Sequence, residues 1–558
     1  MPPARGRTSP AAELAPEPRR RERRVAMSLS VLAAASLAFI AVAAQVVRLA
    51  LVGQDSGPGL HMTQPVVATF TRPDIIDRNG RLIATDLSAY SLFADPQAVL
   101  DADEAAEDVG RIFPDIDQRA LRAQLADKSK RFVWIKRGLS PELAQRVHNL
   151  GLPGLAFRNE PKRSYPLGRL AGHLLGTVSI DNNGLSGIER HIDQSMGLEP
   201  DLSGQAITPP VVLTIDIGVQ HGLEEELATA MARYTARGAA GVLMDVNSGE
   251  VLAGASMPDV NPADASEGQE SERIDRLQVA TYELGSIFKM VTVAMVFDYN
   301  LATPDTVIDV RQPLRVGPHV IRDPHPAGRP LSVRDVFVRS SNVGAGRLAL
   351  SAGVERQQEF LQRLGLTTAL EWDAGVTTAP RLPKRWGKAE LITISYGHGI
   401  ALAPLQFAVA AASLVNGGFA VAPSLIRAAP GAKPANNRLR RVIRSETSAK
   451  VRELMRRNVI DAHGTGRRAA VDGFDVGGKT GTAERAAAGG YKEHAVVSSF
   501  VAVFPISKPR YLLMVTLVEP KPAAGTKGHI TAGVNAAPVA GAIIERIGRL
   551  LPLYRRGH

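Results

Sequence analysis

Apolar and polar residues follow patterns that change from region to region along the chain. Near the start, Val25–Val47 contains no charged residue, and roughly 20 apolar residues are enough to cross a bilayer. Farther on, Asp103–Ile112 and Gln118–Leu125 have the spacing of amphipathic helices, and Val66–Phe70 and Tyr90–Ala94 are typical of strands. The pattern predicts a membrane segment followed by a mixed region of helices and strands.

The second half of the chain has two predicted hairpins far apart in sequence. The first consists of Gly241–Val246 and Glu250–Ala255, joined by the turn residues Asn247-Ser248-Gly249. The second consists of Ser498–Phe504 and Tyr511–Val518, with a turn that contains proline. Because mostly helical sequence lies between them, we expect one antiparallel sheet, built from distant strands and covered by helices.

Two segments rich in glycine and proline, residues 53–59 and 197–210, separate these regions. Within the last region, helices are predicted at Leu223–Tyr234 and at about Gly285–Tyr299, and the second is apolar nearly all round, as a buried helix is. We therefore expect four parts: a basic tail at 1–24, a transmembrane anchor at 25–47, a non-catalytic first domain at 60–200 and a second domain at 208–548.

The charge distribution indicates a direction across the membrane. The chain has a net charge of +11, and seven arginines against three glutamates in residues 1–24 give a local charge of +4. Positive residues before an apolar run keep the N-terminus in the cytoplasm, so the remainder would be exported. A cleaved signal peptide stays an alternative, because Ala41-Val42-Ala43 has the form of a cleavage site, although the apolar run is longer than a usual signal core.

Composition excludes several classes of chemistry. The chain has no cysteine, which excludes disulfides, zinc–thiolate sites and thiol nucleophiles. The positive charge is not accompanied by a nucleic-acid motif, so we expect no nucleic-acid partner.

One charged residue, Lys289, interrupts the apolar helix predicted at Gly285–Tyr299. It follows Ser286 by one helical turn, so the two side chains should lie on the same face. Burial favours a neutral amine, which could accept the serine proton. The plain alternative is that Ser286 only caps the helix and that Lys289 extends to solvent.

Two further motifs combine hydroxyl, amide and amine groups: Ser340-Ser341-Asn342, and Lys479-Thr480-Gly481 followed by Thr482. Taken singly, Ser340 and Asn342 could cap a helix predicted at Val343–Leu350, and Lys479 could belong to an ordinary strand edge. Three such motifs in this order are improbable by chance.

The three motifs resemble those of penicillin-binding proteins and class A serine β-lactamases. Other segments resemble boxes of class B penicillin-binding proteins: Arg72-Pro-Asp-Ile-Ile-Asp77-Arg78-Asn-Gly80, Arg163-Ser-Tyr165-Pro166-Leu-Gly168, Gly187-Ile-Glu189, Tyr396-Gly-His-Gly399 and Pro404-Leu-Gln406. Within class B, the division-specific (septal, FtsI-type) enzymes fit best, partly because Asn342 closes the second motif. Leu284 and Pro73 depart from the residues common in the family.

The resemblance implies a membrane-anchored α+β protein, in which a pedestal precedes a β-lactamase-like penicillin-binding domain. It also implies a peptidoglycan D,D-transpeptidase. Ser286 would be acylated by the D-Ala–D-Ala end of a stem peptide, and Lys289 would accept its proton. Ser340 would pass that proton to the leaving amine, and Asn342 would orient Lys289.

Substrate binding is implied for the third motif. Lys479 would bind the terminal carboxylate, Thr480 and Thr482 would add hydrogen bonds, and Gly481 would let the substrate backbone approach. The backbone N–H groups of Ser286 and Thr482 would form the oxyanion hole. The resemblance implies neither a metal nor an organic cofactor, and a β-lactam would acylate Ser286.

The implied setting is the division septum, at the inner membrane, with one membrane helix and an extracytoplasmic body. Implied partners are nascent peptidoglycan stem peptides, a polytopic FtsW-type glycosyltransferase and other division proteins. Three alternatives stay open: an elongation-specific class B enzyme of the side wall, a carboxypeptidase or β-lactamase, and a catalytically silent scaffold or β-lactam sensor.

Overall fold

The computed structural model describes residues 36–37, 40–44, 72–195, 209–317, 319–427, 438–487 and 490–552. The predicted anchor at 25–47 lies outside these residues except for 36–37 and 40–44, and so does the strand predicted at Val66–Phe70. In the described ranges, no helix is both long and apolar enough to span a membrane. The anchor therefore stays a prediction from the sequence.

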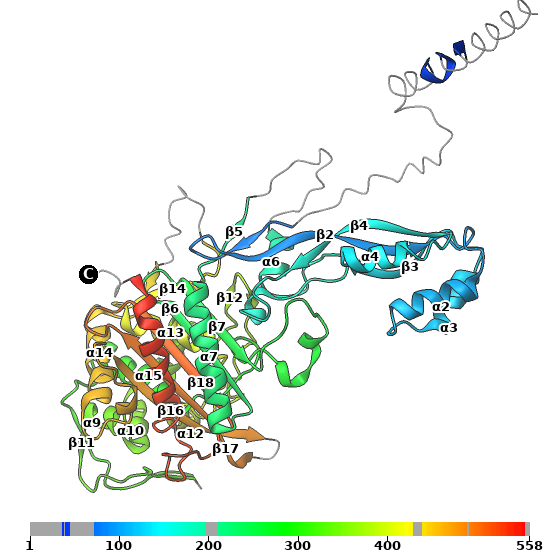
Figure 1. Cartoon of the computed structure of the whole chain (residues 1–558). Coiled ribbons are helices and arrows are strands. Elements are labelled where there is room, and N and C mark those ends of the chain that lie inside the picture. The colour runs from blue at the N-terminus through cyan, green and yellow to red at the C-terminus, as the bar shows by residue number, and fades with distance from the viewer. Residues whose placement is uncertain are drawn as a thin grey trace, which may run out of the picture. The chain divides into compact units, whose positions relative to one another are not determined.

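The pedestal is built on a sheet whose order is β3-β2-β1-β5, with β4 also paired to β2 (Figure 1). Its strands are β1 (Ile75–Ile76), β2 (Leu82–Ala94), β3 (Val133–Leu139), β4 (Leu155–Ser164) and β5 (Val211–Val212). The strand predicted at Tyr90–Ala94 is the second half of the long β2, which pairs with β4 over ten residues. Because β5 belongs to this sheet, the chain returns to the pedestal before it enters the second domain.

The helices of the pedestal are α2 (Ala102–Ile112), α3 (Gln118–Ala126), α4 (Pro141–His148), α5 (Gly172–Leu175) and α6 (Gly187–Ser195). The first two confirm the predicted helices to within one residue at each end. Asp101 and Asp117 fix their starts, because each carboxylate accepts hydrogen bonds from two backbone N–H groups of the first turn.

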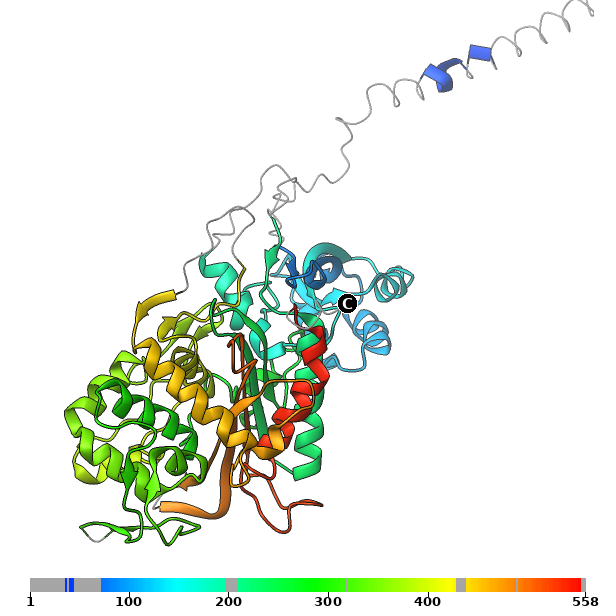
Figure 2. The same cartoon turned by 90° about the vertical axis from the view of Figure 1, so that its left-hand side faces the viewer.

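The second domain contains one five-stranded antiparallel sheet with the order β16-β17-β18-β6-β7, and helices lie on both sides of it (Figure 2). Its strands are β6 (Gly238–Asp245), β7 (Val251–Met257), β16 (Gly477–Ala487), β17 (Gly490–Phe504) and β18 (Tyr511–Val518). The two predicted hairpins do join, because β18 pairs with β6 from Tyr511 opposite Asp245 to Val518 opposite Gly238. This arrangement confirms the sheet built from distant strands.

Helices cover both faces of this sheet, and the sequence of β18 reflects that burial. Along β18, Leu512 and Met514 belong to one apolar core, whereas Leu513 and Val515 belong to the other. A strand covered on both sides is apolar throughout rather than alternating. The helices that contribute to these cores include α7 (Ile217–Tyr234), α8 (Lys289–Asp298), α13 (Pro404–Val415) and α15 (Ala536–Ile547).

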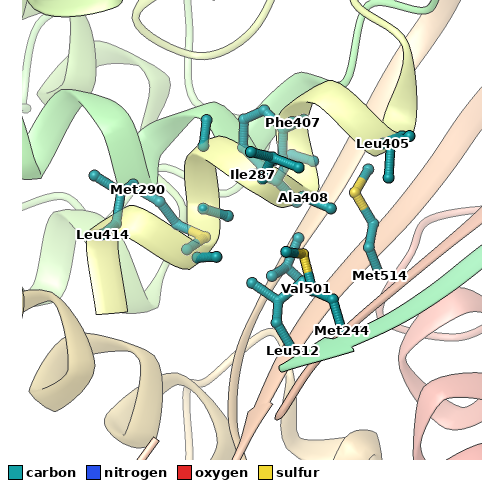
Figure 3. Packing of buried hydrophobic residues seen from close by; sticks show 14 of the residues in the cluster. Met244, Ile287, Met290, Leu405, Phe407, Ala408, Leu414, Val501, Leu512 and Met514 are labelled. Atoms are coloured by element: carbon teal, nitrogen blue, oxygen red, sulfur yellow. The ribbon is translucent and has the colours of Figure 1, made fainter. Parts of the chain in front are cut away.

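The core on the side of α8 and α13 fixes the helix that carries the first motif. Phe407 and Ala408 of α13 lie among Ile287 and Met290, and Met514 of the sheet faces them (Figure 3). Such interiors are packed as densely as organic crystals, so the motif has little freedom to shift.

Helix α7 begins at Ile217, six residues before the predicted start at Leu223, because the Asp216 carboxylate caps it. The other helices are α9 (Val333–Val338), α10 (Asn342–Ala352), α11 (Val354–Arg363), α12 (Lys388–Ile394) and α14 (Ser445–Ile460). Short two-stranded ladders pair β8 (Val307–Ile308) with β11 (Leu331–Ser332), β9 (Leu314–Val316) with β10 (His319–Ile321), β12 (Glu371–Trp372) with β13 (Gly375–Val376) and β14 (Phe419–Val421) with β15 (Arg438–Arg441).

Candidate active site

Ser286 lies in a 3₁₀ turn, Gly285–Phe288, that leads directly into α8. The turn replaces the first α-helical turn expected from the sequence. In 3₁₀ geometry, side chains three residues apart eclipse each other, and the Lys289 Nζ atom lies 2.8 Å from Ser286 Oγ. Gly285 has φ +58°, and a Cβ there would lie 2.4 Å from the carbonyl oxygen of Thr482, so the turn is pressed against the neighbouring strand.

The Lys289 amine is surrounded by hydrogen-bond acceptors and is only 1% exposed. Besides Ser286, it contacts the carbonyl oxygen of Ser340 at 2.8 Å, Ser340 Oγ at 3.1 Å and Asn342 Oδ1 at 2.8 Å. Burial lowers the pKa of Lys289 well below its usual value, and the charge of Lys479 lowers it further. The alternative in which Lys289 extends to solvent is therefore wrong.

The second motif reaches Lys289 from the loop before α10. Ser341 Oγ accepts from the backbone N–H of Gly344 and caps this helix. The cap is therefore Ser341, and not Ser340 or Asn342 as the plain alternative held. Ser340 adopts a left-handed conformation with φ +61°, which is uncommon outside glycine and typical of functional sites. Ser340 and Asn342 are thereby left free to meet Lys289.

The third motif lies on β16. Lys479 is fully buried, and its Nζ atom lies 3.1 Å from Ser340 Oγ. The Ser340 hydroxyl thus lies 3.1 Å from the amines of both lysines, Lys289 and Lys479. Burial lowers the pKa of Lys479 to about 7.

Gly481 serves the fold in a way that the sequence did not indicate. A Cβ at this position would lie 2.3 Å from the carbonyl oxygen of Leu284 and 2.9 Å from Ile287 Cγ2. The missing side chain therefore lets the nucleophile turn pack against β16. The hydroxyl groups on either side also have protein partners, because Thr480 Oγ1 donates to Thr465 Oγ1 at 2.7 Å and Thr482 Oγ1 accepts from the backbone of Ala532 at 2.9 Å.

The three motifs border one cleft of about 760 Å³. The residues of the motifs that line it are Ser286, Ser340, Ser341, Asn342, Thr480 and Thr482. His398, from the Tyr396-Gly-His-Gly399 segment, also lines it. Burial lowers the pKa of His398, so its imidazole favours the neutral form.

Sequence reasoning missed Asp323, which holds the second motif in place. Its carboxylate accepts hydrogen bonds from Ser341 Oγ at 2.6 Å, from the Asn342 backbone N–H at 2.6 Å and from the Val343 backbone N–H at 2.9 Å. An acidic residue in a polar loop nineteen residues before Asn342 carries no local signal for this role, since the contact depends on tertiary folding.

The site combines a serine hydroxyl, an adjacent buried amine whose pKa is lowered, and a second lysine near the Ser340 hydroxyl. This combination defines an enzyme of serine acyl transfer, because the amine can activate the serine as a nucleophile.

Comparisons with known proteins agree with this class. Residues 239–545, more than half of the chain, match the family model "Penicillin binding protein transpeptidase domain". Residues 68–197 match the model "Penicillin-binding Protein dimerisation domain". The chain therefore belongs to the penicillin-binding proteins, and its two domains place it in class B.

Comparison with individual relatives identifies the type of class B penicillin-binding protein. The chain is 37% identical over 492 residues to "Probable peptidoglycan D,D-transpeptidase FtsI" of Caulobacter vibrioides, which covers 87% of this chain and 82% of that protein. It is 28% identical over 506 residues to "Peptidoglycan D,D-transpeptidase FtsI" of Escherichia coli, covering 86% and 84%. The crystal structure of penicillin-binding protein 2X from Streptococcus thermophilus has the same fold, with a TM-score of 0.66, 21% identity and coverage of 86% and 79%. The chain is of the FtsI type.

Proposed function

We propose that this protein cross-links peptidoglycan by moving the acyl group of one stem peptide through Ser286 to an amine of a neighbouring stem. The observation that carries the proposal is the 2.8 Å contact between Lys289 Nζ and Ser286 Oγ inside a buried cluster. Within the described residues, Lys289 donates to no carboxylate, so nothing in its hydrogen-bond shell compensates a positive charge.

In the acylation step, Lys289 accepts the hydroxyl proton while Ser286 Oγ attacks the carbonyl between the two terminal D-alanines. When the tetrahedral intermediate collapses, the C–N bond breaks and the leaving amine needs one proton. Ser340 Oγ, within 3.1 Å of Lys289 Nζ, can relay that proton because a hydroxyl both donates and accepts. Lys289 then returns to its neutral form, and the substrate remains as an ester on Ser286.

Lys479 is assigned to the terminal carboxylate of the donor stem. An ammonium that is fully buried next to an open cleft gains its counter-charge only when an anion binds. Thr480 and Thr482 line the same cleft and are assigned as further hydrogen-bond partners of the peptide. Asn342 is assigned to orient Lys289.

In the second step, an amine of an acceptor stem attacks the ester carbonyl of the acyl-enzyme. Lys289 accepts a proton from that amine, the C–O bond to Ser286 breaks, and the serine recovers its proton. The product is an amide between two stems. The backbone N–H groups of Ser286 and Thr482 are assigned to the oxyanion in both steps, where one donor is typically worth about 3 kcal/mol.

The cellular setting is part of the same proposal. The likeness to FtsI proteins supports a role at the division septum. The apolar run at 25–47 supports a single membrane helix with a cytoplasmic tail and an extracytoplasmic body. An FtsW-type polytopic glycosyltransferase is the proposed partner. A fluorescent fusion that follows the side wall rather than mid-cell would instead favour the elongation type.

Labelling with a fluorescent penicillin, read by gel and by intact mass, tests the chemistry. Wild-type protein should gain one stable penicilloyl adduct, and Ser286→Ala should gain none. Ser271→Ala, which changes an exposed serine outside the cleft, is the matched control and should label as the wild type does. An adduct on Ser286→Ala, or rapid release of hydrolysed penicillin by the wild type, would overturn the assignment.

A further inference from the structure

The wall of the cleft beside Ser286 is rich in basic residues. Its described lining includes three arginines and two exposed histidines: Arg339, Arg467, Arg468, His325 and His463. In the same described lining, Asp323 is the only carboxylate. That carboxylate is already occupied, since it accepts three hydrogen bonds from the second motif. The cleft therefore has a surplus of positive charge.

The arginines of this wall have no protein counter-ion in the part of the chain that the structure describes. The Arg467 side chain donates only to the carbonyl oxygen of Ala462, at 3.3 Å, and neither Arg339 nor Arg468 forms an ion pair with a described residue. Two partly exposed arginines outside the cleft, by contrast, are neutralised by carboxylates. Arg137 contacts two carboxylates, and Arg169 contacts another two. The difference leaves the guanidinium groups of the cleft available to a ligand.

The wall is also fixed relative to the nucleophile. Arg339 directly precedes Ser340, so its backbone position follows that of the second motif. Arg467 and Arg468 begin a short 3₁₀ turn whose preceding loop is fastened to β16. Thr480 Oγ1 donates to Thr465 Oγ1 of this loop at 2.7 Å, and Asn458 of α14, which accepts from Thr465 Oγ1, donates through Nδ2 to the carbonyl oxygen of Gly478 at 2.9 Å.

We propose that the arginine wall, defined as Arg339, Arg467 and Arg468, selects stem peptides that carry free side-chain carboxylates over peptides in which the same groups are amides. This inference rests on the proposed transpeptidase function. A guanidinium forms paired, charge-assisted hydrogen bonds with a carboxylate but only neutral ones with an amide oxygen. Lys479 is assigned to the terminal carboxylate, so the wall serves additional carboxylates farther from the scissile bond.

These carboxylates can belong to the donor stem or to the acceptor stem, because both must enter the cleft during one cycle. The assay therefore has two arms. In the first, D-alanine release is measured from two synthetic pentapeptides that differ only in side-chain carboxylates or amides. In the second, one fixed donor is used, and transfer is measured to an acidic acceptor and to its amidated counterpart.

The full-length protein in detergent should show a higher kcat/KM for the acidic peptide in at least one arm. Arg467→Gln combined with Arg468→Gln should lower kcat/KM for that peptide about ten-fold, since two exposed charge pairs together contribute roughly this factor. It should leave the amidated peptide within about two-fold. Arg119→Gln combined with Arg146→Gln removes the same charge from exposed pedestal positions and should keep the preference.

Equal use of acidic and amidated peptides by the wild type in both arms would overturn the proposal. So would an unchanged preference in the Arg467/Arg468 variant, or an equal loss in the pedestal control. The penicillin adduct reports whether a variant is folded, and its absence from the wild type would instead count against the proposed function. If the cleft variant does not fold, salt decides the question, because raising NaCl must erase the wild-type preference by screening exposed charges.

Discussion

The pedestal and the second domain each contain a buried cluster of charged groups, and the two clusters are built in opposite ways. In the pedestal, Arg72 and Arg163 are both nearly inaccessible, and both donate to the Glu189 carboxylate, at 2.9 Å and 2.7 Å. Arg163 also pairs with Asp86 at 3.1 Å. Every buried cation of this cluster thus has a buried anion beside it.

In the active site, Lys289 and Lys479 are buried just as deeply, but their hydrogen-bond partners are hydroxyl, carbonyl and amide oxygens. The consequences for protonation differ accordingly. Burial by itself lowers the pKa of Arg163, yet the charges of Glu189 and Asp86 raise it overall. Burial lowers the pKa of both lysines. For Lys289 the charge of Asp323 opposes this shift only in part, and among the described residues Lys479 has no such opposing charge.

The comparison teaches that burial alone does not make a charged residue reactive. A buried cation with a buried anion stays charged and holds elements together. A buried amine without an anion is ready to lose its proton, and strongly perturbed groups of this kind in a cleft are typical of functional sites. The same residue class thus serves structure in one domain and chemistry in the other.

The largest expected effect comes from replacing Lys289. Lys289→Met removes the base, and Lys289→Arg places there a cation that cannot lose its proton. Both variants should acylate with penicillin at least about 10²-fold more slowly, within the 10²–10⁴-fold range typical of a lost general base. Stopped-flow acylation rates measure this effect, and thermal melting checks that each variant is folded.

Lys508→Arg, at an exposed position of the same domain, is the matched control for Lys289→Arg and should acylate at the wild-type rate. A folded Lys289→Arg protein that acylates normally would show that the neutral amine is not required. In that case the absence of a buried anion beside Lys289 would not explain the reactivity of the site.

The next largest expected effect is on the stability of the pedestal. Glu189→Gln leaves Arg72 and Arg163 buried without their shared counter-ion, and removing one partner of a buried pair typically costs about 3–5 kcal/mol. Urea denaturation, followed through a probe in the pedestal, should show a lower midpoint. Penicillin acylation of the folded protein should remain, since Glu189 lies in the other cluster.

The control for Glu189→Gln is Glu107→Gln in α2, which breaks an exposed pair with Arg111 in the same domain. Exposed pairs are well hydrated and contribute little, so the midpoint should not move measurably. If both substitutions shifted it equally, pairing rather than burial would determine stability in the pedestal.

The sequence was sufficient for the parts that depend on local pattern. It predicted α2 and α3 to within a residue, because their apolar spacing is a local signal. It also predicted that the two distant hairpins belong to one antiparallel sheet covered by helices, although it did not identify β6 and β18 as the strands that join them. It placed Ser286 and Lys289 one turn apart because they are three residues apart on a predicted helix. It did not predict the 3₁₀ geometry of that turn, which lies against Thr482 of a distant strand.

Tertiary contacts explain what the sequence could not predict. Ser341 rather than Ser340 caps α10, because the helix begins one residue earlier than predicted, at Asn342. Gly481 is needed by the turn at Leu284, a segment almost two hundred residues earlier. Asp323 reaches the second motif across a loop, and no spacing rule connects the two.

Asp323 gives the smallest predicted effect and the finest test of the comparison, because it is the carboxylate whose charge raises the pKa of Lys289 against burial. Asp323→Asn keeps the shape but removes that charge. All three hydrogen bonds to the carboxylate lose their charge assistance, and one loses its acceptor atom, so acylation should slow about ten-fold. Without the negative charge, the pKa of Lys289 falls further, and the acid limb of the pH–rate profile should move to lower pH.

Asp335→Asn, in nearby α9, controls for a general loss of charge and should leave the acid limb of the pH–rate profile in place. If the acid limb moves to higher pH, or moves equally in both variants, then the charge of Asp323 does not affect the pKa of Lys289. The role of Asp323 would then be limited to positioning Ser341 and Asn342.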